Sequence, residues 1–213
     1  MSLWVMERSS DAPGVYFNRP DLVAKINSSG VDLGNVRSWF LRLSESADLD
    51  FSMVNAAGDV QMVASPVDVL FWSWVPILSL RAKELFISLG CSEDDFIACT
   101  VGRDEVCCAH LPRQGEDVFD FSKSSFSMLI PMTPPLPFGI MEAVMKSDRN
   151  DVPSPCIFRS KIPRHGQVLS ELFVCNDVLN GWKDKGMSGA VFRQVCGRPC
   201  KTPGTGMSTG DAG

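Results

Sequence analysis

The stretch VPILSLRAKELFISLG, residues 75–90, decides the fold class of this chain. It opens with an apolar run that ends at Ser79, a residue type whose hydroxyl readily caps a helix N-terminus. Gly90 then closes the pattern, as glycine commonly does after a helix. Between these two residues, four apolar positions recur at helical spacing: Ala82, Leu85, Phe86 and Leu89. The stretch therefore predicts a strand that leads directly into a short amphipathic helix.

A second stretch, residues 171–195, repeats this order of elements. Residues 172–174 predict a strand, Asn176 or Asp177 a helix cap, and Gly186 the helix end, before a strand over residues 190–195. Placing Gly90 on Gly186 aligns the two stretches without a gap. An internal duplication would explain the match, and so would two units that meet the same packing requirements. Both interpretations stay open at this point.

Short apolar segments elsewhere predict more strands. Residues 3–6 predict an opening strand, and residues 96–101 predict a buried one that continues into a hairpin turn at residues 102–105. Residues 37–43 alternate through Trp39, Leu41 and Leu43, which predicts a strand. Two further strands are expected at residues 51–54 and 60–64, around a turn at residues 57–59. The fold class predicted is α+β: mostly antiparallel sheet with short amphipathic helices and two related strand-helix-strand units.

The domain prediction is a single α+β domain over residues 1–199. Four prolines between residues 129 and 139 favour a stiff, extended connection, so two sub-halves of about 1–125 and 126–199 could meet there. The Gly-, Ser- and Thr-rich end of the chain has almost no apolar content to bury. We therefore expect residues 200–213 to be a disordered tail.

Bulk composition excludes several classes of protein. No apolar run reaches the roughly 18 residues of a membrane-spanning helix, and the first residues do not resemble a secretory signal. These features predict a cytoplasmic protein that does not bind a membrane, in which the eight cysteines are reduced thiols. A formal net charge of -5 argues against binding to nucleic acid.

The sequence contains no recognisable motif for catalysis or cofactor binding. The two histidines, His110 and His165, lie in no nucleophile motif, and the chain has no phosphate-binding loop. We therefore expect no enzyme activity and no cofactor. Two alternatives remain: a small cytosolic hydrolase or transferase that uses carboxylates with one histidine, and a metal or redox module that uses Cys107, Cys108 and His110 with one remote cysteine.

Protein binding is the remaining class of function, and the candidate contact residues are acidic or aromatic. Acidic groups in loops can form a surface that faces a basic partner, although solvated loops are their ordinary role. Two tryptophans that flank Ser73 share one side of a strand, where they would be core residues or interface anchors. The candidate residues are Glu93, Asp94, Asp95, Glu116, Asp117, Asp120, Trp72 and Trp74.

The two strand-helix-strand stretches resemble a bacterial polymorphic-toxin immunity family, formerly a domain-of-unknown-function family and often linked to type VI or contact-dependent effectors. The resemblance rests on residues 171–195, with their G-x-x-G-x-x-F strand, and on residues 66–96, in which a proline and an aspartate precede a strand and a serine-capped helix. Cys175 stands where a serine is common in that family.

The resemblance implies a non-enzymatic function. An immunity protein binds its cognate toxin and neutralises it by stoichiometric occlusion of the active site. The expected partner is a toxin that is basic at the contact face, and the protein itself is expected to be a monomer or a homodimer. Electrostatic steering by acidic residues would speed association, and buried aromatic anchors would slow release.

Overall fold

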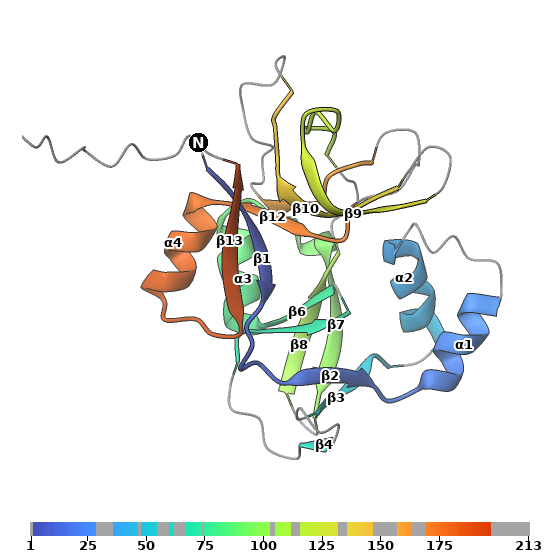
Figure 1. Ribbon diagram of the computed structural model, residues 1–213. Helices are drawn as coiled ribbons and strands as arrows, with labels where there is room; N and C mark the ends of the chain where they lie inside the picture. The colour runs from blue at the N-terminus through green and yellow to red at the C-terminus, as the bar shows by residue number, and fades with distance from the viewer. Residues whose placement is uncertain are drawn as a thin grey trace, which may run out of the picture.

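A computed structural model of the 213-residue chain describes residues 2–28, 36–46, 48–54, 60–61, 67–73, 75–102, 105–111, 116–131, 136–146, 157–162 and 169–196. Within these residues the chain forms a four-stranded sheet, a seven-stranded sheet and a two-stranded hairpin (Figure 1). All strand pairs are antiparallel except β3 and β7, which are parallel. The structure is therefore of the α+β class, as the sequence predicts.

Each sheet joins strands that are far apart in the chain. The four-stranded sheet has the order β11 (Ile157–Phe158), β12 (Leu172–Cys175), β1 (Leu3–Arg8), β13 (Ala190–Cys196). The seven-stranded sheet has the order β2 (Gly14–Phe17), β3 (Asp50–Val54), β7 (Phe96–Val101), β8 (Glu105–His110), β6 (Val75–Ser79), β5 (Val69–Trp72), with β4 (Val60–Gln61) beside β3. The hairpin pairs β9 (Ser125–Ile130) with β10 (Leu136–Glu142). Strand β1 thus lies between β12 and β13, which come much later in the chain.

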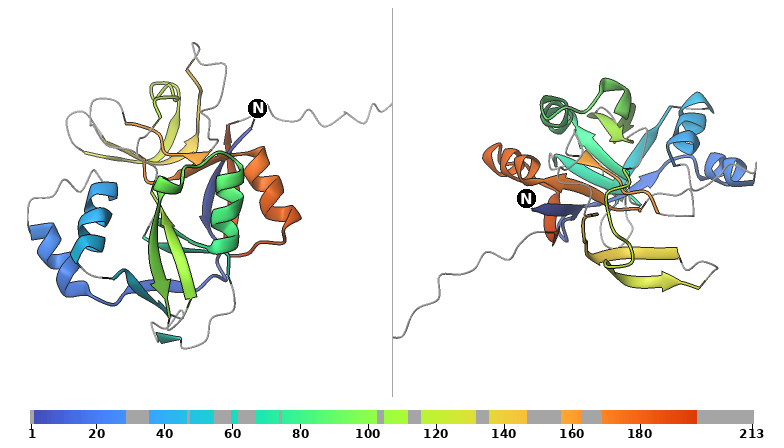
Figure 2. Two further views of the ribbon diagram at one scale, coloured as in Figure 1. Left: turned by 180° about the vertical axis from the view of Figure 1, so that it is seen from behind. Right: turned by 90° about the horizontal axis from the view of Figure 1, so that it is seen from above.

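Helices flank the two larger sheets. They are α1 (Pro20–Ser28), α2 (Val36–Ser46), α3 (Leu80–Ser88) and α4 (Asn176–Asp184), with a short 3-10 turn η1 (Glu93–Asp95). Figure 2 shows α1 and α2 on one side of the molecule, α3 and α4 on the other, and the hairpin apart from both pairs. No helix in the described ranges is long and apolar enough to cross a membrane.

The two predicted strand-helix-strand units are confirmed. The Ser79 hydroxyl accepts a hydrogen bond from the backbone N–H of Ala82 and caps α3, while Gly90 adopts φ 101 just beyond that helix. In the second unit Cys175 occupies the N-cap position, one residue before the predicted Asn176, and Gly186 adopts φ 58 after α4. Positive φ values of this kind favour glycine.

The two units also share a topology. In the first, the strands before and after the helix, β6 and β7, lie on either side of β8. In the second, the corresponding strands β12 and β13 lie on either side of β1. The middle strand is antiparallel to both neighbours in each case. The likeness therefore extends from local sequence to strand order, beyond the shared need for a capped amphipathic helix.

The predicted strand at residues 37–43 is wrong, because this segment belongs to helix α2. Phe40 and Leu43 are fully buried, whereas Leu41 is exposed. Burial three residues apart is the helical period, and it places Phe40 and Leu43 against β3 and its neighbours in one apolar cluster. The strands predicted at residues 3–6, 51–54 and 96–101 match β1, β3 and β7. Of the strand predicted at residues 60–64, residues 60–61 form β4, and the rest lies outside the described residues. The predicted turn at residues 57–59 and the predicted tail at 200–213 lie outside the described residues.

Three apolar clusters form the core. One lies between the seven-stranded sheet and α2, another contains Phe86 of α3 and Trp182 of α4, and the third contains Phe173 of β12 and Phe119. The helices α3 and α4 approach so closely that a Cβ atom at Gly181 would lie 2.8 Å from a methyl carbon of Leu85. Dividing the chain into sub-halves of about 1–125 and 126–199 would separate β1 from both of its partner strands, β12 and β13.

Asp68 joins the two larger sheets. This residue precedes β5 and is only 5% exposed. The carboxylate accepts hydrogen bonds from the Ser79 hydroxyl (3.1 Å) and from Nε and Nη2 of Arg81 (2.9 and 2.6 Å), at the start of α3. It also accepts one from the backbone N–H of Ser188 (2.9 Å), in the loop before β13. Burial by itself would raise the pKa of Asp68, but the hydrogen bonds from Arg81, Ser188 and Ser79 outweigh it and lower that pKa.

Gly189 forms a second contact between the two larger sheets, through its backbone. Its φ is 90, and a Cβ atom there would lie 2.2 Å from the carbonyl oxygen of Val69. The Gly189 carbonyl accepts a hydrogen bond from the N–H of Ser9 (3.0 Å), which follows β1. The loop between α4 and β13 is therefore packed directly against the main chain of β5, and only a residue without a side chain fits there.

Candidate functional site

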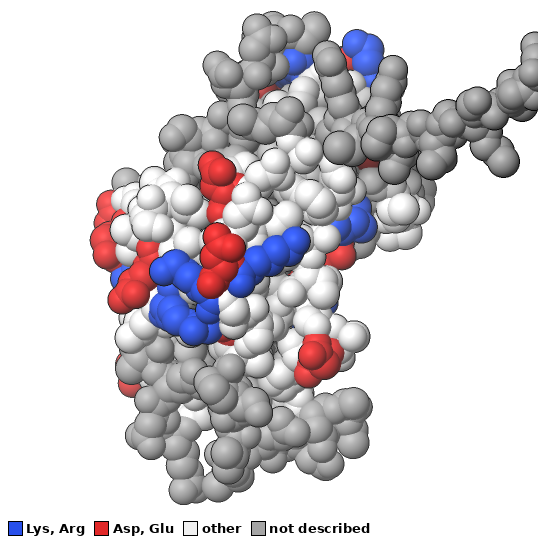
Figure 3. Space-filling model, turned by 90° about the vertical axis from the view of Figure 1, so that its left-hand side faces the viewer, with Lys and Arg blue, Asp and Glu red and all other residues white. Residues whose placement is uncertain are grey.

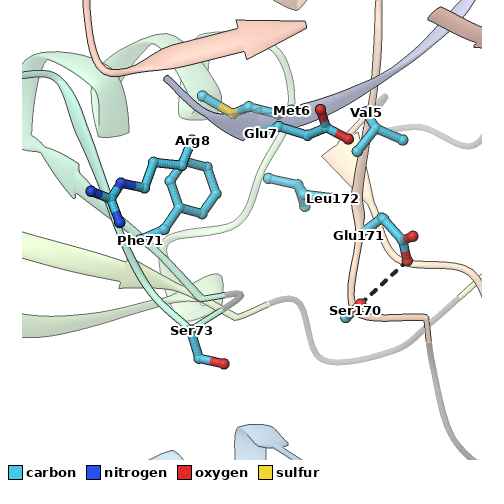
Figure 4. Close-up of a pocket in the computed structure, with 9 residues that line it drawn as sticks. All are labelled: Val5, Met6, Glu7, Arg8, Phe71, Ser73, Ser170, Glu171 and Leu172. Atoms are coloured by element: carbon cyan, nitrogen blue, oxygen red, sulfur yellow. Dashed lines mark hydrogen bonds between the residues drawn. The ribbon is translucent and has the colours of Figure 1, made fainter. Parts of the chain in front are cut away.

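An open pocket of about 200 Å³ lies where the two larger sheets meet (Figure 4). Strand β1 forms one wall, the end of β5 and its turn form another, and the segment that enters β12 forms the third. The apolar lining residues are Val5, Met6, Phe71 and Leu172. The polar lining residues are Glu7, Arg8, Ser73, Ser170 and Glu171. The interior is thus apolar, and charged groups lie around it.

Ser73 occupies a left-handed turn beside the pocket. Trp72 pairs with Val75 across the β5–β6 hairpin, so the connection has two residues, and Ser73 adopts φ 56. Two-residue hairpins favour such conformations, normally with glycine or asparagine. A non-glycine residue held there costs on the order of 1 kcal/mol. Backbone strain of this kind is common where a turn is part of a binding site.

Glu171 carries the carboxylate at one end of the pocket. One carboxylate oxygen accepts a hydrogen bond from the backbone N–H of Ile140 on β10 (2.8 Å), and the other accepts one from the Ser170 hydroxyl (3.3 Å), drawn in Figure 4. Behind it, Arg159 is buried, which lowers the pKa of its guanidinium to about 9, while the charge of Glu171 opposes that shift. Arg159 is therefore protonated at neutral pH.

Glu7 connects the pocket to Ile140 of β10, the residue that also binds Glu171. Its carboxylate accepts hydrogen bonds from Arg193, with Nε at 2.8 Å and Nη2 at 2.7 Å. The Nη1 atom of Arg193 donates in turn to the Ile140 carbonyl (2.8 Å). Both pocket carboxylates thus fix the base of the β9–β10 hairpin, one directly and one through Arg193.

Arg8 lies at the opposite end of the pocket from Glu171, with Phe71 and Leu172 between them (Figure 4). Its Nε and Nη2 atoms donate to the carbonyl of Ala12 (3.1 and 2.6 Å). This acceptor is a neutral carbonyl, so Arg8 keeps its positive charge at its own end of the pocket. The pocket therefore has an anionic end and a cationic end, separated by an apolar floor.

The size of the pocket limits what it can hold. Sites for small molecules usually enclose about 300–1,000 Å³, so about 200 Å³ suits a single large side chain better. A lysine or arginine side chain could lay its aliphatic stem on Phe71 and Leu172 and place its cationic head at Glu171. Ser73 and Ser170 are the hydroxyl groups in the lining, and no histidine lines the described pocket.

The first predicted acidic group lies at η1, between α3 and β7. Ser92 and Asp95 form a capping box there, so Asp95 serves the local turn. Glu93 forms an ion pair with Lys83 (2.6 Å), and Lys83 also lies over the Phe96 ring. Asp94 donates its backbone N–H to the Ser92 hydroxyl. These residues are surface groups with local roles and do not line the pocket.

The second predicted acidic group precedes the hairpin. Asp117 pairs with Lys146 (2.6 Å), and Glu116 forms a bridge with Ser160 through its backbone. The Ser122 hydroxyl and Lys123 lower the pKa of Asp120 to about 2. Figure 3 shows basic and acidic side chains interspersed on the face that carries α4, without a patch of one sign. On this face, negative charges are therefore interspersed with positive ones.

Trp72 packs in the core, and Trp74 lies outside the described residues. The Trp72 ring lies 5.9 Å from Phe17, 5.5 Å from Phe40 and 5.6 Å from Phe51, measured between ring centroids. These contacts give Trp72 a structural role next to the pocket turn. To act as an interface anchor, Trp72 would have to leave this aromatic cluster. Its predicted contact with a toxin stays a prediction.

The proposed metal ligands are not brought together. Cys107 and Cys108 are neighbours on β8 and therefore point to opposite faces of the sheet, with Cys107 in the cluster beside α2. His110 is fully buried between Phe86 and Phe96, with Nε2 3.8 Å from the sulfur of Cys91. Among the described residues, no three His, Cys, Asp or Glu side chains form a metal-binding group. His165 lies outside them.

The pocket residues Glu7, Arg8 and Glu171 were not predicted from the sequence. They come from two segments more than 160 residues apart, and nothing local marks them as a group. Neither the comparison with protein-family models nor the comparison with curated proteins gives a match. The arrangement of the site itself therefore has to carry any functional conclusion.

Proposed function

We propose that this protein is a non-enzymatic immunity protein that binds a cognate bacterial toxin and blocks its active site. The observation that carries the proposal is the pocket between the two sheets, which is sized for one side chain and lined by apolar residues with Glu171 at one end. Interfaces are dominated by a few side chains that fill such pockets. The toxin would contribute a lysine or arginine, in line with a basic contact face.

The chemistry of Glu171 supports a basic anchor. Its carboxylate accepts hydrogen bonds from two neutral donors, the Ile140 N–H and the Ser170 hydroxyl, and it interacts with the charge of buried Arg159. An incoming cation would add a charge-assisted hydrogen bond from the pocket side. A charge-assisted hydrogen bond is worth about 1.5–3 kcal/mol. The apolar floor would cover the methylene groups of the same side chain, which adds burial to charge pairing.

The first experiment is co-purification of this protein with the product of its neighbouring gene, followed by calorimetry and a growth-rescue assay. We expect one-to-one binding in the nanomolar range and rescue of cells that express the toxin. If there is neither binding nor rescue, the immunity proposal is wrong and the carboxylate-dependent hydrolase becomes the better hypothesis.

Glu171→Gln tests the pocket. Glutamine keeps an oxygen for the Ile140 N–H but removes the charge, so we expect affinity for the toxin to fall by about tenfold or more, as measured by calorimetry. Glu84→Gln is the matched control, because Glu84 is an exposed carboxylate on α3 away from the pocket lining. Equal affinities for the two variants would place the contact elsewhere on the protein.

A further inference from the structure

The outer edge of β9 has no paired strand in the described part of the chain. The inner side of the hairpin differs. There the Ile140 N–H of β10 bonds to Glu171, the Ile140 carbonyl accepts from Arg193, and the Ala143 N–H bonds to the Val195 carbonyl of β13 (2.7 Å). One edge of this two-stranded sheet is therefore closed, and the other is open as far as the described residues go. Two-stranded sheets are marginally stable by themselves, and a third strand stabilises them.

The side chains of β9 do not protect that open edge. Its sequence, SFSMLI over residues 125–130, has no charged residue and no proline, the two devices that usually prevent strands from adding to an edge. Met128 is 52% exposed and Leu129 is 56% exposed. Because neighbouring residues of a strand point to opposite faces, these two side chains leave apolar surface on both faces. A partner lying on one face of the hairpin would cover only Met128 or only Leu129. A strand added at the edge of β9 would instead continue both faces of the sheet.

We infer that β9 pairs with β9 of a second copy of this chain, antiparallel and around a two-fold axis at Met128. The pattern of β9 supports this register, because Phe126, Met128 and Ile130 share one face. With the axis at Met128, Phe126 of one copy faces Ile130 of the second, and Met128 faces its own image. All three pairs on that face are then apolar, and the two hairpins become one four-stranded sheet.

Continuity with the core also favours this face. Phe126 stacks on Phe121, with ring centroids 5.5 Å apart, and packs against the cluster that contains Ile140. The apolar face of β9 thus begins in the core and continues outward to Met128. A second copy would extend the core cluster without placing a charged side chain opposite another, since β9 has none.

Charge and area predict a weak dimer. Each chain carries a formal charge of -5, so the copies repel at long range, and added salt should screen this repulsion and strengthen the dimer. A basic partner on the same edge would show the opposite salt dependence. A six-residue strand is only about 20 Å long, so pairing of the edge alone falls in the class of small, transient interfaces.

The test uses cysteine substitutions in the full chain under mild oxidation, with the protein alone, so that its outcome is independent of toxin binding. Met128→Cys should give a disulfide-linked dimer of twice 23.3 kDa, because the two positions face each other across the axis. Leu129→Cys is the matched control: its exposure is similar, but its image lies two positions along the strand, beyond disulfide reach. Unmodified protein gives the baseline for the native thiols.

A selective disulfide at position 128 would support the pairing. Equal yields from both variants would indicate random collision and overturn it, as would a yield at position 128 no higher than the baseline. As a second measurement, Met128→Lys places two like charges at the axis and should lower the dimer fraction in light scattering at least about tenfold. Leu80→Lys, an equally exposed site on α3, should leave that fraction unchanged. A dimer that survives Met128→Lys would also contradict the inference.

Discussion

Replacing Gly189 by alanine should lower the free energy of unfolding by about 4 kcal/mol, through backbone strain and a steric clash together. The new methyl group would lie 2.2 Å from the Val69 carbonyl oxygen and within 3.3 Å of two more main-chain atoms of that residue. Val69 is fully buried and lies on a paired strand, so its backbone atoms cannot move aside as a flexible side chain can. Denaturant unfolding, followed by circular dichroism, measures the loss.

Gly186→Ala is the control that separates the two contributions. Gly186 also has a positive φ, 58, but a Cβ atom there meets nothing within 4 Å. Gly186→Ala should therefore lower the free energy of unfolding by only about 1 kcal/mol, from the backbone conformation alone. If both variants lose the same stability, the loop between α4 and β13 does not press on β5, and the joint between the sheets has been described wrongly.

Asp68→Asn should lower the free energy of unfolding by about 3 kcal/mol. The carboxylate accepts hydrogen bonds from Ser79, Arg81 and the Ser188 N–H. Asparagine keeps one oxygen, while its amide group directs N–H donors at groups that are donors themselves. Glu93→Gln, which breaks an exposed ion pair with Lys83, is the control and should cost less than about 1 kcal/mol.

The pH dependence of unfolding gives an independent readout for Asp68. Its folded-state pKa is lowered, so the folded protein holds the ionised form more strongly than the unfolded chain does. This contribution to stability is complete above the unfolded pKa, which is about 3.9, and is lost as the pH falls through the folded pKa. The stability difference between the unmodified protein and Asp68→Asn should therefore shrink below about pH 4. A difference that stays constant down to pH 2 would contradict this role of the carboxylate.

The helices and strands that the sequence predicts correctly are those specified by local chemistry. Ser79 caps α3, and Gly90 and Gly186 end α3 and α4, with interactions that lie within a few residues. Helix α2 was missed because Trp39, Leu41 and Leu43 satisfy a period of two. Phe40 contradicts that period, since it occupies a position that strand alternation leaves polar, and its burial together with Leu43 reveals the helix.

The candidate site could not be predicted in the same way. Glu7 and Glu171 become neighbours of Ile140 only because β1 and β12 pair in one sheet and β10 crosses nearby. The acidic groups that the sequence does mark, such as Asp95 and Asp120, cap turns or pair with adjacent lysines. Charge clusters in a sequence therefore indicated local turns here, while the pocket arises from tertiary pairing.

The position of β1 between β12 and β13 also bears on how the protein is made in the cell. Its residues Leu3, Val5 and Met6 are buried in the folded protein, yet the ribosome makes them well before their partner strands β12 and β13. Until residues 172–196 have been synthesised, this apolar strand has no place in a sheet. Nascent chains that still lack residues 172–196 therefore expose an unpaired apolar strand, which makes them substrates for chaperones and proteases.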